Sequence, residues 1–338
     1  KEQVDGVLAY ASDPAAPTAA YVAEKMGLPG SPYESVEILC NKDKFRAFLK
    51  ENGFCTPEAK GYTDIEDAIL DIQNGYFKYP IIVKPVDSSG SKGVSRIDSF
   101  EQAEGLLEYA MSYSRGHRII VEEFVEKYGY QIAGDGLSVD GKLVFRYFAN
   151  DHFDTRCKNP FVPVAASFPY NMPDDVQDKI HATIQRLLTL LGMRTSTYNF
   201  DMRIDKDYNV YLMEVAPRDG GNYIPQAIRY ATGVDLVECS VKAAMGEKIE
   251  IPEHIQPQGT LILMGVSEHP VPVFTRTVLE KGMTLVGCSR SGRDDFLAAI
   301  DVMRDKDIQR RLSQIVHFDG EVNDIKDIKR VFATDLQN

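Results

Sequence analysis

The sequence lacks several features that would assign its function at once. It has no apolar run long enough to span a bilayer, which argues against a membrane-spanning helix. Its five cysteines are scattered without a CxxC pair, which argues against a zinc site or a disulfide framework and suits a reducing cytosol. The formal net charge of −12 disfavours nonspecific binding to nucleic acid. We therefore expect a cytoplasmic protein with neither a membrane nor a nucleic acid as its partner.

The chain is long and apolar enough to bury a sizeable core. With 338 residues, of which 43% are hydrophobic, it is expected to form two or three domains of mixed α/β (α+β) class. Residues 4–13 have the pattern of a buried strand, and residues 17–26 that of a helix. This order is typical of the closing part of an α/β domain. Because the strand would have no neighbour, we expect that the N-terminus is truncated or processed.

A loop rich in glycine and serine follows an apolar strand that is predicted over residues 79–86. Backbone N–H groups in such a loop can surround phosphate oxygens, and Lys84 at the strand end adds positive charge. A plain hairpin loop is an equally good interpretation of this segment alone. The G-x-x-x-x-G-K-[ST] spacing of a Walker A loop is absent. The loop consists of Ser88, Ser89, Gly90, Ser91, Lys92 and Gly93.

Two carboxylates stand on a predicted hairpin over residues 199–215. Asp201 and Glu214 would face each other across the strand pair if the register is suitable. Like charges repel, so a buried pair needs a cation, and hard oxygen ligands suit Mg²⁺. The alternative is two solvated carboxylates, but the apolar neighbours Met213 and Val215 make simple solvation of Glu214 a poorer explanation.

A third segment, VEEFVEKYGYQI over residues 121–132, joins an apolar strand to two acids and then to Phe124 and Val125. Its backbone could read an adenine edge, but paired acids at a strand end are usually solvated. The order of the segments is more specific than any one of them. Lys42, Lys84, the Glu-Glu-Phe-Val run, Asp201 and Glu214-x-x-x-Arg218 together resemble the ATP-grasp superfamily, in particular carboxylate–amine ligases and the carbamoyl phosphate synthase large subunit.

The resemblance covers residues 1–250 and implies two lobes with antiparallel sheets that clamp ATP. Residues 1–35 would be the remnant of a Rossmann-like domain that precedes the ATP-grasp domain. The ATP-grasp domain would occupy residues 36–250, with a smaller nucleotide-clamping lobe over 36–125 and a metal and substrate lobe over 126–250.

The resemblance also implies a role for each residue. Lys42 and Lys84 would contact the phosphates, with Lys84 also near adenine N7, and the Gly/Ser loop would close over the β and γ phosphates. Asp201 and Glu214 would hold Mg²⁺, or Mn²⁺ in its place. Arg218 would steady the acyl phosphate or the substrate carboxylate and, with Lys84, would take the catalytic role.

The adenosine end is implied in the same way. Glu122 would accept a hydrogen bond from the adenine amino group, and the backbone of Glu123 and Val125 would form the hinge. The family usually places a glutamate on the ribose hydroxyls, and here the matching residue is Gln131, whose amide can still bond a diol.

A second departure concerns the metal. The family usually has Asn two residues after the metal glutamate, and here that position is Ala216. Alanine cannot ligate a metal, so either one Mg²⁺ site is weakened or Asn222 substitutes.

Residues 258–338 form a separate small α/β module by their pattern. The phrases LMGVSE, LEKGMTLVG and SRSGRDDF resemble the C-terminal part of a zinc-type medium-chain dehydrogenase of the kind that acts on sugar-alcohol phosphates. The module has no GxGxxG turn, no ribose-binding acid and no zinc-ligand cluster. We therefore favour a structural cap or docking domain, and we expect that NADH and NADPH do not bind it.

The sequence as a whole predicts a ligase that uses ATP and Mg²⁺ to join a carboxylate to an amine through an acyl phosphate, as in EC 6.3-type enzymes. Its substrates would be small molecules whose identity cannot be read, and residues 151–173 are expected to help line their pocket. Homodimerisation is left open. One alternative is a nucleotide-binding regulatory or scaffolding protein with weakened catalysis, which Ala216 and Gln131 favour. The other is a fusion with an oxidoreductase module.

Overall fold

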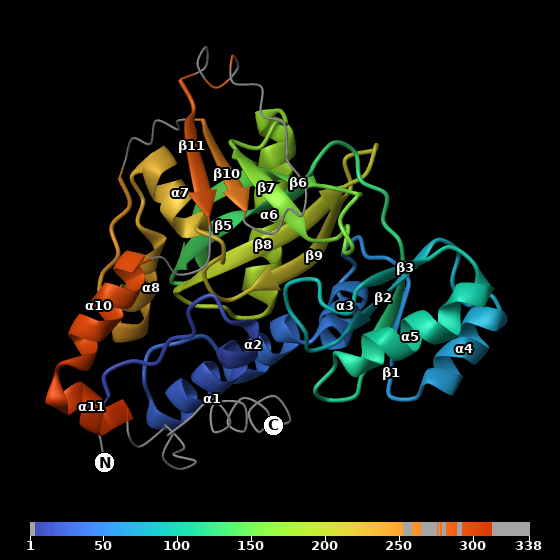
Figure 1. The fold of residues 1–338 in the computed structure, drawn as a ribbon, viewed down its shortest axis with the longest axis horizontal. Helices are drawn as coiled ribbons and strands as arrows, with labels where there is room; N and C mark the ends of the chain where they lie inside the picture. Colours follow the sequence, from blue (N-terminus) through green and yellow to red (C-terminus); the bar gives the residue numbers. More distant parts are fainter. Residues whose placement is uncertain are drawn as a thin grey trace, which may run out of the picture. The chain divides into compact units, whose positions relative to one another are not determined.

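The computed structural model describes residues 4–252, 259–264, 276, 278, 282–288 and 293–312 (Figure 1). The chain divides into two compact units, Lys1–Cys288 and Ser289–Asn338. The first unit contains two sheets, and each sheet is the centre of one lobe.

The smaller lobe is built on a four-stranded sheet of order β1-β4-β2-β3, in which every paired neighbour is antiparallel. Alternate residues of its strands, such as Ile81, Val83 and Val121, are fully buried because one face packs against α4 and α5. The bounds are β1 Ala59–Tyr62, α4 Ile65–Gln73, β2 Ile81–Pro85, β3 Ser95–Ile97, α5 Ala103–Ser112 and β4 Ile119–Glu123.

The larger lobe is built on a seven-stranded sheet of order β11-β10-β7-β6-β5-β8-β9. All of its pairs are antiparallel except β10 with β11. One face buries the apolar stripe of α6, and the other packs against α7 and α8. The bounds are β5 Gln131–Val139, β6 Lys142–Phe153, β7 Pro163–Phe168, α6 Asp174–Leu190, β8 Ser196–Ile204, β9 Val210–Ala216, α7 Ile224–Thr232, α8 Leu236–Met245, β10 Thr260–Met264 and β11 Thr284–Cys288.

The two-lobed arrangement of antiparallel sheets confirms the predicted fold class. The strand predicted over residues 4–13 is wrong, because residues 4–12 take no strand conformation. Leu8 is 42% exposed, and a strand is stable only when a neighbour accepts its backbone hydrogen bonds. Three helices follow this segment and lead into the smaller lobe: α1 Ala16–Met26, α2 Tyr33–Cys40 and α3 Lys42–Glu51.

The chain beyond residue 258 differs from the predicted separate module in one respect. Among its described residues, strands β10 and β11 belong to the first compact unit, because β10 pairs with β7 and with β11. The second unit contains the helices α10 Arg293–Met303 and α11 Lys306–Leu312. Within the described ranges, every helix is too short or too polar to cross a membrane.

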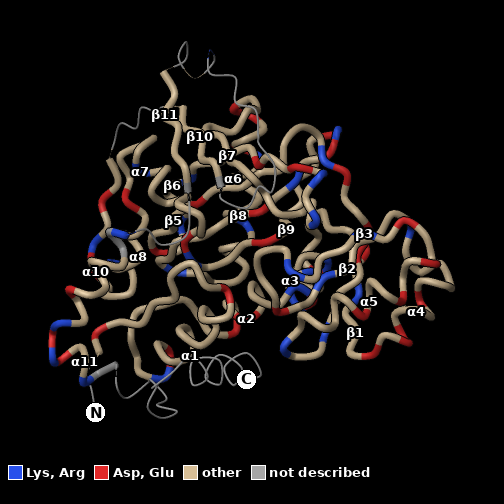
Figure 2. The backbone as a smooth tube through the Cα atoms, viewed as in Figure 1, with Lys and Arg blue, Asp and Glu red and all other residues tan. Residues whose placement is uncertain are grey.

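Charge is unevenly placed in this acidic chain. Figure 2 shows basic residues gathered around α3 and β2, close to the larger sheet. Anions are therefore favoured where the two lobes meet.

Candidate active site

The two lobes enclose a cavity of about 390 Å³, here called the interlobe cavity. The smaller lobe contributes β2 and the loop after it, and the larger lobe contributes β8 and β9. Most of the residues that were predicted from the sequence line this one cavity: Lys42, Lys84, Ser88, Ser89, Gly90, Ser91, Lys92, Gln131, Asp201 and Glu214.

The Gly/Ser loop reaches across the cavity to the larger lobe. The hydroxyl of Ser91 donates to the carbonyl oxygen of Phe161 (2.9 Å), and the side-chain amide of Asn159 donates to the carbonyl oxygen of Ser91 (2.8 Å). Gly93 has a φ of +71°, and a Cβ there would lie 2.8 Å from Cγ of Pro85, so only glycine fits. The loop is therefore closed over the cavity, although Gly93 does not itself line it.

Lys84 is held by a buried ion-pair network. Glu122 is 1% exposed and pairs with both Lys84 and Arg46, whose Nε lies 2.6 Å from the carboxylate. Burial opposes ionisation, but the charges of Arg46 and Lys84 lower the pKa of Glu122 to about 2. The remaining guanidinium nitrogens of Arg46 donate to the carbonyl oxygens of Leu212 (3.0 Å) and Met213 (3.1 Å) on β9. Arg46 thus ties the two lobes together.

This network bears on the predicted adenine contact. The Glu122 carboxylate is not among the groups that line the interlobe cavity, and its contact with an adenine amino group stays a prediction. The side chain of Glu123 accepts from the backbone N–H of Lys78 (2.9 Å), which leaves the backbone of Glu123 as the group predicted to face the base.

Asp201 and Glu214 are cross-strand partners on β8 and β9, as predicted, and both line the cavity. Burial raises the pKa of Asp201 to about 6, and the Glu214 charge adds to the effect. Burial also opposes ionisation of Glu214, but Lys42 at 3.7 Å and Arg218 at 3.9 Å hold the pKa of Glu214 below its usual range. Two facing carboxylates of this kind fit a divalent cation.

These two carboxylates fit a metal ion that takes only two of its ligands from the protein. Among the described residues no three His, Cys, Asp or Glu side chains form a metal-binding group, and Ala216 offers no ligand. Mg²⁺ usually keeps several water ligands and shares the rest with substrate phosphates, so two carboxylates suffice. Asn222, with a φ of +53°, lines neither the interlobe cavity nor the second cavity described below.

Gln131 joins the predicted hinge to the acid pair. Its side-chain oxygen accepts from Nε (3.0 Å) and Nη2 (2.9 Å) of Arg203, and its amide donates to Asp201 (2.8 Å). Arg203 also donates to the carbonyl oxygen of Val125 (2.7 Å). The sequence patterns did not reveal Arg203, because nothing near residue 203 in the chain shows that its partners lie about 70 residues away.

A second cavity, of about 250 Å³ and here called the Asp13 cavity, is lined by Asp13. Arg218 does not line it, but the Arg218 guanidinium is 8% exposed and pairs with Asp13 at 2.6 Å. Burial and the Glu214 charge raise the pKa of Asp13 despite this partner. The Asp13 cavity is lined by acids and bases together: Asp13, Glu37, Asp87, Glu214, Lys42 and Arg115.

The two cavities meet at Lys42, Ser88, Met213 and Glu214, which line both. Residues 151–173 were expected to line the substrate pocket. The structure places four of them on the interlobe cavity and none on the Asp13 cavity: Phe153, Thr155, Pro160 and Phe161.

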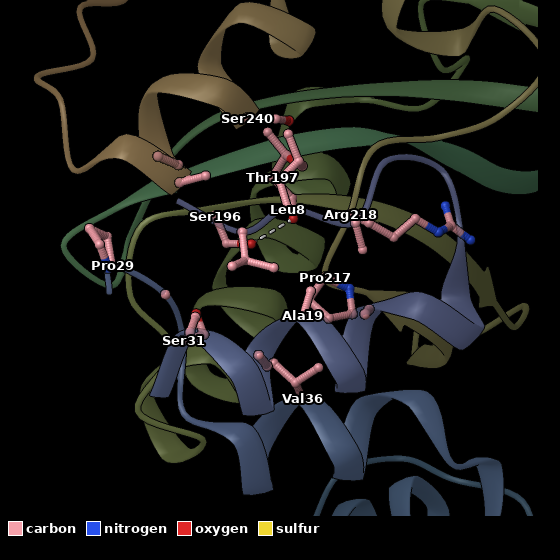
Figure 3. A pocket seen from close by; sticks show the side chains of 18 of the residues that line it. Leu8, Ala19, Pro29, Ser31, Val36, Ser196, Thr197, Pro217, Arg218 and Ser240 are labelled. Carbon is pink, nitrogen blue, oxygen red and sulfur yellow. Dashed lines mark hydrogen bonds between the residues drawn. The ribbon is translucent and has the colours of Figure 1, made fainter. Parts of the chain in front are cut away.

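A third cavity, of about 80 Å³, has Arg218 among its lining residues (Figure 3). Its wall consists mainly of small apolar and hydroxyl side chains, including Ala19, Ser196 and Thr197. Figure 3 shows that the Arg218 side chain extends away from the other labelled residues. This cavity thus has no charged group directed into it among the side chains drawn.

The phrases that resemble a dehydrogenase fall largely outside the described residues, since 265–270 and 289–292 are not described. That resemblance and the expected absence of NADH and NADPH binding stay predictions.

Comparison with known proteins gives one family and several partial likenesses. The family model of the D-ala D-ala ligase C-terminus matches residues 49–225. The solved structure of an L-amino acid ligase from Bacillus licheniformis has a TM-score of 0.61 and 26% identity, over 75% of this chain and 59% of that one.

Two curated relatives match over different lengths. The carbamoyl phosphate synthase large chain of Thermotoga petrophila is 23% identical over 228 residues, or 68% of this chain and 20% of the relative. The ribulose-5-phosphate reductase of Streptococcus pneumoniae is 50% identical over 100 residues, or 29% of each chain. This chain therefore spans less than a third of the length of either relative.

Proposed function

Because the chain belongs to the family of the D-ala D-ala ligase C-terminus and has the ATP-grasp fold, we propose that it is an ATP- and Mg²⁺-dependent ligase that joins a carboxylate to an amine. The predicted membership of the ATP-grasp superfamily is confirmed by the family match and by the structural likeness. The protein's substrates are small molecules.

One observation carries the proposal. A closed Gly/Ser loop, the partly buried Lys84 and a facing acid pair come from two different lobes and line one cavity. That cavity shares Glu214 and Lys42 with a second cavity that holds charges of both signs. A nucleotide in the first cavity would therefore place its terminal phosphate beside a substrate in the second.

The chemistry requires two displacements. A carboxylate oxygen of the first substrate attacks the γ-phosphorus of ATP, and ADP leaves with the bridging oxygen. The amine nitrogen of the second substrate then attacks the acyl carbon, and inorganic phosphate leaves as the amine loses a proton. Catalysis of this kind depends on positioning and on charge neutralisation rather than on a protein nucleophile.

The residues divide these tasks. Lys42 and Lys84 offset the phosphate charge, and the loop over residues 88–93 excludes water from the interlobe cavity. Arg218, poised by Asp13, steadies the negative charge on the reacting carboxylate. Asp201 and Glu214 would hold Mg²⁺, which would supply positive charge to offset the negative charge of the phosphates.

The Asp13 cavity is the proposed site of the carboxylate and amine substrates. Arg115 and Lys42 are suited to a carboxylate, and Asp13, Glu37 and Asp87 to an ammonium group. The cavity of about 250 Å³ limits these substrates to small molecules.

A screen of acid and amine pairs for ATP-dependent phosphate release tests the proposal. The expected result is release that requires ATP, Mg²⁺ and both substrates, together with an amide product detected by mass spectrometry. MgATP binding without phosphate release across a broad panel would favour the regulatory alternative. Phosphate release without any amide product would show a hydrolase instead.

A further inference from the structure

The nucleotide site that we propose has an unexplained acid at its edge. Gln131 stands at the position predicted to bind the ribose hydroxyls, but the structure already uses both ends of its side chain. Its oxygen accepts two hydrogen bonds from Arg203, and its NH₂ group donates to Asp201. The Gln131 side chain therefore links Arg203 at the predicted hinge to Asp201 of the acid pair by hydrogen bonds. The ribose hydroxyls then need another acceptor.

Asp151 is placed to be that acceptor. It is the cross-strand partner of Gln131 in the β5–β6 pair, and directly opposed residues project from the same face of a sheet. Gln131 lines the interlobe cavity, so this face of the sheet is the nucleotide face. Lys127, which also lines the cavity, is close enough to Asp151 for their charges to interact.

The Asp151 carboxylate is buried without a full set of partners. The residue is 7% exposed and is not itself among the residues that line the interlobe cavity, and its Oδ1 has no hydrogen-bond partner in the structure. Burial, with the charge of Asp201, raises the pKa of Asp151 well above its usual range, and Lys127 offsets only part of this. A buried acceptor without a donor is costly and calls for an explanation, which a bound ligand would supply.

The order of groups along the cavity points to the kind of ligand. The predicted hinge at Val125 marks the adenine end, and Asp201 marks the phosphate end. Arg203 and Gln131 connect these two points by hydrogen bonds. In a nucleotide the ribose lies between the base and the phosphates, so the Gln131–Asp151 pair stands at the level of the sugar.

We propose that Asp151 accepts hydrogen bonds from the ribose hydroxyls of the bound nucleotide and so selects a ribonucleoside triphosphate. The cis-diol offers two O–H donors, and a carboxylate offers acceptors only, so the pairing satisfies both sides. This inference rests on the proposed function, because it needs ATP in the interlobe cavity. It transfers the sugar contact from Gln131 to its neighbour on the next strand.

The test compares ATP with 2′,3′-dideoxy-ATP, both with Mg²⁺, by isothermal titration calorimetry. The wild-type protein is expected to bind ATP at least about tenfold more tightly than the dideoxy analogue, as hydrogen bonds to a charged acceptor require. Asp151→Ala is expected to bring this ratio close to one, and Asp151→Asn, which keeps one acceptor oxygen, to an intermediate value. The Asn variant also serves if the Ala variant does not fold.

Two controls separate sugar recognition from general weakening. Glu126→Gln removes an exposed acid from the same hinge segment, and the ratio is expected to stay at the wild-type value. Gln131→Ala is expected to weaken the binding of ATP and of the analogue by the same factor, because its amide serves Arg203 and Asp201.

Four outcomes would overturn the inference. A ratio of the two affinities near one in the wild-type protein would mean that the ribose hydroxyls make no contact that strengthens binding. An unchanged ratio in both Asp151 variants, or a ratio lost through Gln131→Ala alone, would place the contact elsewhere, and the proposed ligase function would still stand. Failure of the wild-type protein to bind MgATP at all would refute the proposed function and this inference together.

Discussion

The interlobe cavity and the Asp13 cavity share Glu214, but they differ in how many of their lining residues could be predicted from the sequence. The interlobe cavity is lined by a compact loop, a strand-end lysine and a hairpin acid pair. The Asp13 cavity draws on helices, loops and strand β9, at positions scattered from residue 13 to residue 216. The difference teaches that a polyphosphate demands a patterned set of groups, whereas a small acceptor substrate can be held by groups with no common spacing.

The variant with the largest expected effect removes the residue that both cavities share. Glu214→Gln deletes the charge of a proposed metal ligand, and we expect turnover to fall by at least about 100-fold, as for other groups that stabilise developing charge. Circular dichroism is expected to show an unchanged fold. Glu238→Gln, an exposed acid on α8, is the matched control. Wild-type turnover in Glu214→Gln, or loss of its fold, would count against the proposed role.

A second prediction concerns Asp135, a buried acid whose charge interacts with those of Asp219 and Arg218. Asp135 is fully buried and accepts from Asn199 (2.8 Å) and from the backbone N–H of Gly220 (2.9 Å). Burial raises the pKa of Asp135 to about 7 from 3.8, and Asp219 adds to the effect while Arg218 opposes it. Between pH 4 and 7 the folded protein thus keeps a proton that the unfolded chain has released.

Because the folded state holds this proton and the unfolded state does not, the free energy of unfolding of the wild-type protein is expected to fall as the pH rises through this window. In Asp135→Asn the fall is expected to be shallower, by up to about 1.4 kcal/mol per pH unit. Urea unfolding at pH 5, 6, 7 and 8 measures both slopes, and equal slopes in the two proteins would contradict the account.

Asp13→Asn is expected to disturb the Asp13 cavity alone. The change weakens a close ion pair and leaves the buried Arg218 with only the more distant Glu214 carboxylate, at 3.9 Å. We expect the KM of the carboxylate substrate to rise about tenfold, as the loss of a charged hydrogen bond implies. The Kd of MgATP, measured by calorimetry, is expected to stay within about twofold of the wild-type value. An equal loss of affinity for both substrates would mean that the two cavities are not separate sites.

Asn159→Ala makes the corresponding change in the interlobe cavity and has the smallest expected effect. It removes the amide that holds the Gly/Ser loop at Ser91. The KM of ATP is expected to rise about two- to fivefold, because the change removes two neutral hydrogen bonds at the loop, with the KM of the acceptor substrates unchanged. Steady-state rates with each substrate varied in turn decide this point. Asn74→Ala, at the C-terminal end of α4 in the smaller lobe, is the control.

The difference between local and scattered residues also explains which site residues could be predicted from the sequence. Lys84 and the loop after it lie within ten residues of one another, and Asp201 and Glu214 lie on one hairpin, so local patterns revealed them. Arg46 was missed because its partner Glu122 is 76 residues away, and no local pattern connects a helix residue to a strand in this way. Asp13 was missed for the same reason, since Arg218 lies 205 residues further along the chain.

The N-terminal error has a different physical cause. An apolar run such as VDGVLAY has the composition of a strand, but a strand also needs a neighbour, which composition does not reveal. In the described structure these residues pack beside α1 and the loop before α2 instead, where Leu8 and Ala9 line the third cavity.

The most direct test of the central claim is whether MgATP binds to the folded chain. A ligand that binds only the folded state stabilises it by about 2.7 kcal/mol when its free concentration is a hundred times Kd. We therefore predict a clear rise in the melting temperature at millimolar MgATP, and a smaller rise with ATP in the presence of EDTA. An unchanged melting temperature at millimolar MgATP would contradict the assignment of the interlobe cavity as a nucleotide site.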